Sequence, residues 1–232
     1  MAERRDPMLY VSLWSIVEGL HPVEAYDAIC DRIHLDVMSE DYCGTDLFLD
    51  LDPDAVLGAS TLMLDAHLML PDPAGWIVDC PYADRLASVS VHLDGRSRVE
   101  HCLDLLRARG IRTGVAVRLD DPWDDVAALV PEVDQVVVMG TPIGVKGVPL
   151  QEAALETIER LVALRRETGS DVVVIADGGI RADTIGRLAS AGADALAVGS
   201  LLCRSPEAPA TFWRNHGPVP GTTGGRTREV AG

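Results

Sequence analysis

Histidine and aspartate residues stand two positions apart inside apolar segments of this chain. His34 and Asp36 belong to the segment IHLDVM, and Asp65 and His67 belong to LDAHLM. A β-strand points its side chains alternately to two faces, so residues two apart share a face. Asp177 ends a third such segment, VVVIAD. Imidazoles and carboxylates gathered at one end of neighbouring strands would suit one divalent cation, such as Zn²⁺, Fe²⁺, Mn²⁺ or Co²⁺.

Each of these residues taken singly has a plainer interpretation, because a histidine inside a strand is more often a core residue than a ligand. Together they favour the metal, since an ionised carboxylate buried without a partner is costly. Asp65 could instead hold a histidine ligand, His67 or another, through its second ring nitrogen. His92 ends a further apolar segment, SVSVHL, and could line the same pocket or pack in the core.

Two glycine-containing turns follow the last two apolar segments, Gly178-Gly179 and Gly199-Ser200. Backbone N–H groups at such turns commonly hold phosphate in barrels, together with the start of a helix. The alternative to phosphate binding is that these glycines only allow the chain to turn from a strand into a helix. Lys146, the only lysine of the chain, lies in the segment MGTPIGVKGVP and could close over a substrate anion or remain a solvated loop cation. A Schiff-base aldolase needs a lysine in the barrel interior, and no predicted strand offers one.

Segments rich in Val, Ile, Leu and Ala recur eight times and mostly lack polar alternation, which is typical of strands buried on both faces of a parallel sheet. They cover Met8–Ser15, Ile33–Met38, Leu62–Met69, Ser88–Leu93, Gly114–Leu119, Gln135–Gly140, Val172–Asp177 and Ala195–Ser200. Helical patterns between them cover Pro73–Cys80, Ser97–Arg109, Asp121–Val130, Leu150–Thr168 and Ala182–Ala191.

Eight strands that alternate with helices predict an α/β fold, either a closed (β/α)₈ TIM barrel or an open doubly wound sheet. The strand count and the polar residues at the ends of the strands favour the barrel. No GxGxxG follows the first strand, which weakens a dinucleotide-binding interpretation. We therefore expect a single barrel domain over residues 1–216 and a disordered tail over 217–232, which is rich in Gly, Pro and Thr.

The formal net charge of −16 argues against partners that are themselves anionic, namely nucleic acid and membrane surfaces. The five cysteines are scattered and form no CxxC, which indicates reduced thiols in a cytoplasmic protein. No apolar run approaches the length of a membrane span or of a signal-peptide core. We expect a soluble protein whose anionic substrate is held by a local cradle of backbone N–H groups.

Motifs from about Leu9 to Cys203 resemble the ribulose-phosphate 3-epimerase family, and as a set they are highly specific. The matching motifs are VSLWS at 11–15, HxDxM at 34–38, DxHLM at 65–69, the methionine of the sixth strand at Met139, DGGI at 177–180 and GS at 199–200.

The resemblance implies a metal-dependent ketose-phosphate 3-epimerase, an isomerase that interconverts D-ribulose 5-phosphate and D-xylulose 5-phosphate or a close analogue. It implies that the metal is held by His34, Asp36, His67 and Asp177, and that Asp36 and Asp177 exchange a proton with opposite faces of the substrate through an enediolate. It implies that Ser12 contacts the substrate and that the glycine turns bind the phosphate. It also implies that Met38, Met69 and Met139 form an apolar surface around the intermediate, for which core packing is the alternative. It also implies a homo-oligomer.

Three loops depart from the family pattern. The segment SEDYCGT at 39–45 replaces the family's DGxFVPN, TPIGVKG at 141–147 replaces NPGFGGQ, and Arg118-Leu119 replaces Asn-Pro. Because these loops cover the substrate, a hexulose phosphate of the allulose 6-phosphate type, or a sugar phosphate of specialised metabolism, is an alternative substrate. A non-catalytic sugar-phosphate-binding barrel is a second alternative. A phosphate-binding decarboxylase barrel is disfavoured because its DxK motif would need lysine where His67 stands.

Overall fold

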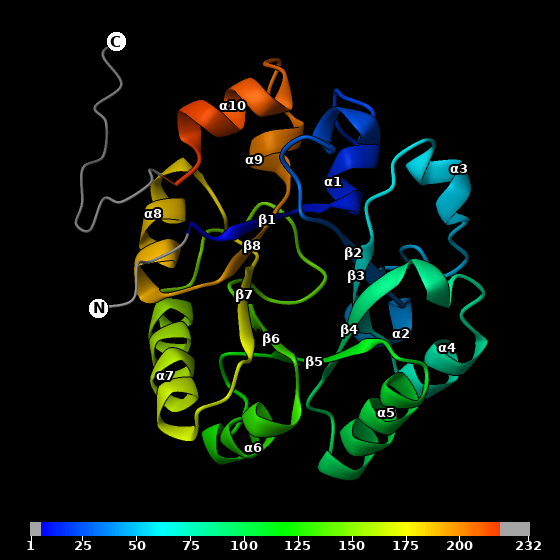
Figure 1. Ribbon diagram of the computed structural model, residues 1–232, viewed down its shortest axis with the longest axis vertical. Helices are drawn as coiled ribbons and strands as arrows, with labels where there is room; N and C mark the ends of the chain where they lie inside the picture. The colour runs from blue at the N-terminus through cyan, green and yellow to red at the C-terminus, as the bar shows by residue number, and fades with distance from the viewer. Residues whose placement is uncertain (1–5, 219–232) are drawn as a thin grey trace.

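A computed structural model describes residues 6–218, so residues 1–5 and the predicted tail from residue 219 onward lie outside the described part. Eight parallel strands form a closed barrel in sequence order, with β1 paired to β8, so the fold is a single-domain TIM barrel as predicted (Figure 1). The strands are β1 (Met8–Ser12), β2 (Arg32–Met38), β3 (Leu64–Met69), β4 (Leu86–His92), β5 (Arg112–Val117), β6 (Gln135–Met139), β7 (Val173–Asp177) and β8 (Ala195–Val198).

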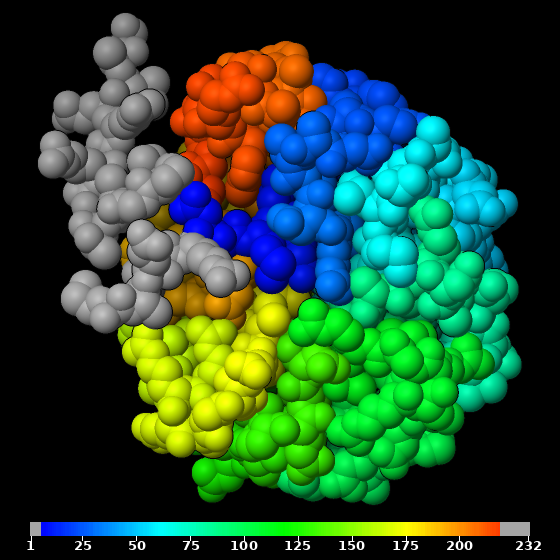
Figure 2. Space-filling model, in the orientation of Figure 1, coloured from blue at the N-terminus to red at the C-terminus, as the bar shows by residue number. Residues whose placement is uncertain are grey.

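Helices surround the barrel; α1 from the start of the chain lies beside α9 from its end, and α10 packs against α9 and residues Val23–Tyr26 (Figures 1 and 2). The α-helices are α1 (Leu13–Val17), α2 (Glu40–Cys43), α3 (Pro53–Leu57), α4 (Pro73–Asp79), α5 (Arg96–Ala108), α6 (Trp123–Leu129), α7 (Ala153–Thr168), α8 (Ala182–Ala191), α9 (Ser200–Cys203) and α10 (Pro209–His216). Short 3₁₀ helices span Val23–Tyr26, Ala83–Arg85 and Val130–Glu132. No helix within residues 6–218 has the length and hydrophobicity that a membrane crossing requires.

The strands are buried on both faces, which explains their continuous apolar character. Side chains that point outward, such as Leu35 and Val37, join a large cluster between the barrel and the helices. Side chains that point inward form a smaller apolar cluster that includes Tyr10, Val137 and Ile175. This inward cluster does not use every inward-pointing position, so the remaining ones on several strands can carry polar groups inside the barrel.

Several predicted strands extend past the observed carboxyl ends, as Gly114–Leu119 does past Val117, and the first and the last run into a following helix. β1 stops at Ser12, because the Ser12 hydroxyl accepts a hydrogen bond from the Ser15 N–H and caps α1. β8 stops at Val198, because Gly199 precedes the short helix α9. A serine or glycine at the end of an apolar segment ends the extended backbone and begins a helix. Both helices consequently begin directly at the mouth of the barrel.

Candidate active site

Four polar side chains converge inside the barrel, near the carboxyl ends of β2, β3 and β7. His34 and Asp36 lie on β2, His67 on β3 and Asp177 at the end of β7. The parallel register sets Asp36 beside His67 on the neighbouring strand. Each of the four residues offers one ligand atom, and these atoms lie within 4.8 Å of one another. We call these four residues the floor of the site.

The ring nitrogens of the floor face its carboxylates without forming hydrogen bonds. His34 Nε2 lies 3.4 Å from Asp36 Oδ1 and 3.5 Å from Asp177 Oδ2, and His67 Nδ1 lies 3.6 Å from each of these two oxygens. Both nitrogens are buried, and neither has a hydrogen-bond partner among residues 6–218. Atoms that bind one tetrahedral zinc ion at about 2.1 Å lie about 3.4 Å apart. The floor therefore fits a divalent cation.

The titration of the floor reflects the close approach of unlike charges. Burial by itself would lower the pKa of His34 and His67, but Asp36 and Asp177 outweigh it and raise both values. Burial would likewise raise the pKa of Asp36 and Asp177, yet the two histidines hold both values below the usual range. A positive charge thus stabilises the paired carboxylates, whether it comes from protons on the imidazoles or from a cation.

Asp65 supports the floor from deeper inside the barrel, where it is fully buried. Its Oδ2 lies 2.8 Å from His34 Nδ1, and its Oδ1 accepts hydrogen bonds from Ser88 Oγ at 2.5 Å and Gln135 Nε2 at 2.6 Å. These hydrogen bonds outweigh the burial of Asp65 and lower its pKa. An ionised Asp65 accepts the Nδ1–H of His34, so that in neutral His34 the lone pair lies on Nε2 and faces Asp36 and Asp177.

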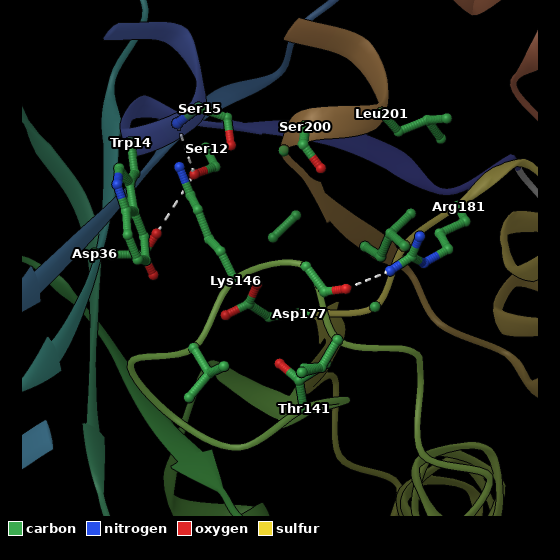
Figure 3. Close-up of a pocket in the computed structure, with 18 of the residues that line it drawn as sticks. Ser12, Trp14, Ser15, Asp36, Thr141, Lys146, Asp177, Arg181, Ser200 and Leu201 are labelled. Atoms are coloured by element: carbon green, nitrogen blue, oxygen red, sulfur yellow. Dashed lines mark hydrogen bonds between the residues drawn. The ribbon is translucent and has the colours of Figure 1, made fainter. Parts of the chain in front are cut away.

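A cavity of about 450 Å³ opens above the floor, within the roughly 300–1,000 Å³ typical of small-ligand sites (Figure 3). Asp36 and Asp177 line it, whereas the two histidines lie beneath them with no exposed surface. The cavity is also lined by every residue that the sequence assigned to substrate contact: Ser12, Met38, Met69, Met139, Lys146, Gly178, Gly179, Gly199 and Ser200.

One end of the cavity is formed by backbone from the glycine turns. Gly178 and Gly179 both have left-handed backbone, with φ of 88° and 69°, which favours glycine. A Cβ atom on Gly199 would lie 2.6 Å from Ser15 Oγ, so a larger residue would require the Ser15 hydroxyl to move away. The helix α8 starts at Ala182, a short distance after the first turn, with Arg181 as its N-cap. Backbone N–H groups and a helix start are thus placed where an anion could bind.

Lys146 reaches across the cavity mouth instead of extending into solvent. Its Nζ lies 2.9 Å from Glu18 Oε2 and 3.9 Å from the centre of the Trp14 ring, which lies beside it in Figure 3. Arg181 holds the same loop from the opposite side, because its guanidinium donates a hydrogen bond of 2.7 Å to the Gly147 carbonyl. The loop after β6 is therefore fastened over the cavity at two points.

The three loops with the unusual sequences surround the mouth of the barrel, and we call residues 39–46, 118–122 and 141–150 the rim. Arg118 donates hydrogen bonds to Asp94 Oδ1 at 3.1 Å and to the Tyr42 hydroxyl, and Tyr42 donates to Asp94 Oδ2. The guanidinium also lies 5.7 Å from the centre of the Tyr42 ring. This cluster ties the first two rim loops together.

Several residues around the site are absent from the sequence-based prediction. Trp14, Thr141, Arg181 and Arg204 line the cavity, and they lie in loops or near the ends of helices. Arg181 lies between a glycine turn and the start of a helix, and this sequence position could have marked it as a cavity residue. The positions of Trp14 and Arg204 depend on how α1 packs against α9, which no local pattern reports.

Comparison with known proteins places the chain in a family. The model of the "Ribulose-phosphate 3 epimerase family" matches residues 15–203. The chain is 29% identical over 180 residues to ribulose-phosphate 3-epimerase of Mycobacterium leprae, which covers 75% of this chain and 78% of that protein. It is 26% identical over 196 residues to ribulose-phosphate 3-epimerase of Escherichia coli K12, which covers 82% of this chain and 84% of that protein.

Solved structures support the fold alone. A mutant α-subunit of tryptophan synthase from Pyrococcus furiosus aligns with a TM-score of 0.63 at 13% identity over 92% of this chain and 97% of that one. The barrel, together with the relatives, defines an isomerase of the epimerase class with a TIM-barrel fold. More particularly, the chain belongs to the ribulose-phosphate 3-epimerase family, as the sequence motifs predicted.

Proposed function

We propose that the protein is a metal-dependent ketose-phosphate 3-epimerase that interconverts D-ribulose 5-phosphate and D-xylulose 5-phosphate or a close analogue. The observation that carries the proposal is the floor, where Asp36 and Asp177 project into one cavity above two imidazoles whose free nitrogens face them. Epimerisation at a carbon beside a carbonyl needs two such groups, since a proton leaves one face and another returns to the opposite face.

His34, Asp36, His67 and Asp177 would hold one divalent cation, of which Zn²⁺, Fe²⁺, Mn²⁺ and Co²⁺ all suit the donor set. When bound, the cation stabilises the negative charge that develops on the substrate oxygens as the C3 proton leaves. Asp65 maintains the orientation of His34 by accepting its Nδ1–H. The floor is thus held by strand backbone and by a second layer of hydrogen bonds.

Asp36 and Asp177 act as the acid and base, and the direction of the reaction decides which of them takes the proton. They come from β2 and β7, on different sides of the cavity, so each reaches one face of a substrate bound between them (Figure 3). Ser12 Oγ lies 3.5 Å from Asp36 Oδ2 and steadies this carboxylate from β1. A carboxylate with a low pKa is ionised at neutral pH and is ready to accept a proton.

The remaining cavity residues position the substrate. The backbone of Gly178, Gly179, Gly199 and Ser200 receives the phosphate, close to the start of α8. Met38, Met69 and Met139, all buried, give the reacting carbons an apolar and water-poor surface. Lys146 closes the mouth of the cavity from the rim. Either it exchanges Glu18 for the substrate anion, or it stays paired with Glu18 while its loop covers the substrate.

The experiment follows the C3 hydrogen. Protein loaded in turn with each of the four metals is incubated with D-ribulose 5-phosphate in deuterated water, and C3 is observed by NMR. Deuterium incorporation with inversion supports the proposal, and D36N is the matched inactive control. A panel of hexulose 6-phosphates run in parallel identifies a larger preferred substrate. Retention of the C3 hydrogen across the whole panel would contradict the proposal and favour a sugar-phosphate-binding protein.

A further inference from the structure

His92, at the end of β4, contacts a floor residue from outside the floor. Its Nε2 lies 2.9 Å from His67 Nε2, and the two ring centres are 4.9 Å apart at an interplanar angle of 42°. Its side chain points into the barrel, and the residue is only 5% exposed. The resemblance and the metal-binding pattern give no role to His92, yet it is the hydrogen-bond partner of His67.

Two imidazole nitrogens form a hydrogen bond only if one carries the hydrogen and the other offers a lone pair. The other nitrogen of His67, Nδ1, is the one that faces Asp36 and Asp177. A nitrogen that binds a cation must be free of its proton, so neutral His67 then carries its hydrogen on Nε2. His67 is the donor, and His92 Nε2 is the acceptor. His92 in turn carries its own hydrogen on Nδ1.

We infer that His92 is a positioning residue, which orients His67 and fixes its tautomer by accepting the Nε2–H. This inference rests on the proposed metal site. It gives His92 the same role toward His67 that Asp65 has toward His34. The two histidines of the floor are thus held by different acceptors, one anionic and one neutral.

A neutral acceptor suits this position because the site is already rich in negative charge. Three carboxylates, those of Asp36, Asp65 and Asp177, lie on or directly behind the floor. A fourth beside His67 would oppose both an anionic substrate and the charge that develops during proton removal. An imidazole orients His67 without adding this charge.

The rim protects the contact between the two histidines. The Tyr42 ring centre lies 5.8 Å from that of His92, and Tyr42 is itself held by Asp94 and Arg118. His92 Nδ1 is buried and has no hydrogen-bond partner among residues 6–218. His67 is therefore the partner that fixes the orientation of the His92 ring, and water has little access to compete for it.

The test compares two substitutions by their metal affinity. In H92Q the side-chain oxygen can still accept the Nε2–H of His67, whereas H92L fills the space without an acceptor. Zn²⁺ and Co²⁺ affinities are measured by chelator competition on the full chain, with thermal unfolding as a check of folding. We expect H92L to bind about 10- to 100-fold more weakly than the wild type, the usual effect of losing such a partner, and H92Q to recover most of the loss.

A second measurement needs no variant. Long-range ¹H–¹⁵N NMR of the Zn²⁺-loaded wild type should place hydrogen on Nε2 of His67 and on Nδ1 of His92. Hydrogen on Nε2 of His92, or equal metal affinity of H92L and the wild type, would overturn the inference and leave the proposed function standing. A wild type that binds no divalent metal would overturn both.

Discussion

The floor and the rim of the site are built in different ways. The floor consists of side chains on regular strands, where His34 and His67 are completely buried, and Asp65 behind them is held by three hydrogen bonds. The rim consists of loops fastened by partly exposed ion pairs. The side chains of Lys146 and Glu18 are 28% and 42% exposed, and those of Arg118 and Asp94 are 25% and 35% exposed.

This difference in construction bears on how easily each region can change. Strand geometry fixes the spacing of the floor residues, which lie on β2, β3 and β7. Exposed ion pairs contribute only about 0–1 kcal/mol each, so the rim can change in sequence at little cost to stability. Under the proposed function, the floor would carry out the reaction and the rim would select the substrate.

The largest expected effect comes from altering the floor. D36N or D177N removes one proton-transfer group and one cation ligand, so kcat should fall by at least about 10²- to 10⁴-fold, and metal affinity should fall as well. D183N is the matched control, because Asp183 lines the cavity in the first turn of α8 and lies outside the floor. Steady-state kinetics and metal analysis check this. Turnover of D36N near that of D183N would contradict the assignment.

A smaller effect is expected from the layer behind the floor. D65N removes the charge that holds His34, so metal affinity should fall about 10- to 100-fold, while the cavity lining is unchanged. D134N is the control, since Asp134 makes comparable hydrogen bonds, to the Thr113 N–H and hydroxyl, away from the site. Chelator competition measures both variants. Equal losses in the two would mean that Asp65 acts only through general stability.

The rim should affect binding more than turnover. K146A is expected to raise KM several-fold with little change in kcat, and to change the free energy of unfolding by no more than about 1 kcal/mol. R187A is the control, because the Arg187–Glu152 ion pair is also exposed but lies outside the cavity lining. A wild-type KM in K146A would remove Lys146 from substrate binding.

The smallest effect concerns thiol reactivity, which compares the accessibility of a cysteine on the rim with that of cysteines in the core. Burial raises the pKa of Cys30 to about 12 and of Cys203 to about 11, so at pH 8 the thiolate fraction of Cys203 is on the order of a thousandth. Cys43, on the rim, is only half-buried. Iodoacetamide followed by peptide mass spectrometry should label Cys43 first. Raising the pH should accelerate the labelling of all three, and first labelling of Cys203 would contradict this order.

The convergence of the four floor side chains could be predicted from the sequence, because strand alternation is a local rule. Residues two apart on β2 share a face in the structure as expected, and Asp177 lies at the end of β7. The partner of Asp65 could not be chosen in advance, since it depends on the register that sets His34 beside Asp65. The contact of Lys146 with Trp14 and Glu18 depends on loop path and helix packing across the barrel, which no periodicity encodes.

The single lysine of the chain sits over the cavity mouth, with 28% of its side chain exposed. Amine-selective reagents therefore find one side-chain target in the whole chain, and it lies on the loop that covers the site. A fluorophore attached there would report on changes in the surroundings of the cavity mouth, with only the terminal amine to be distinguished from it.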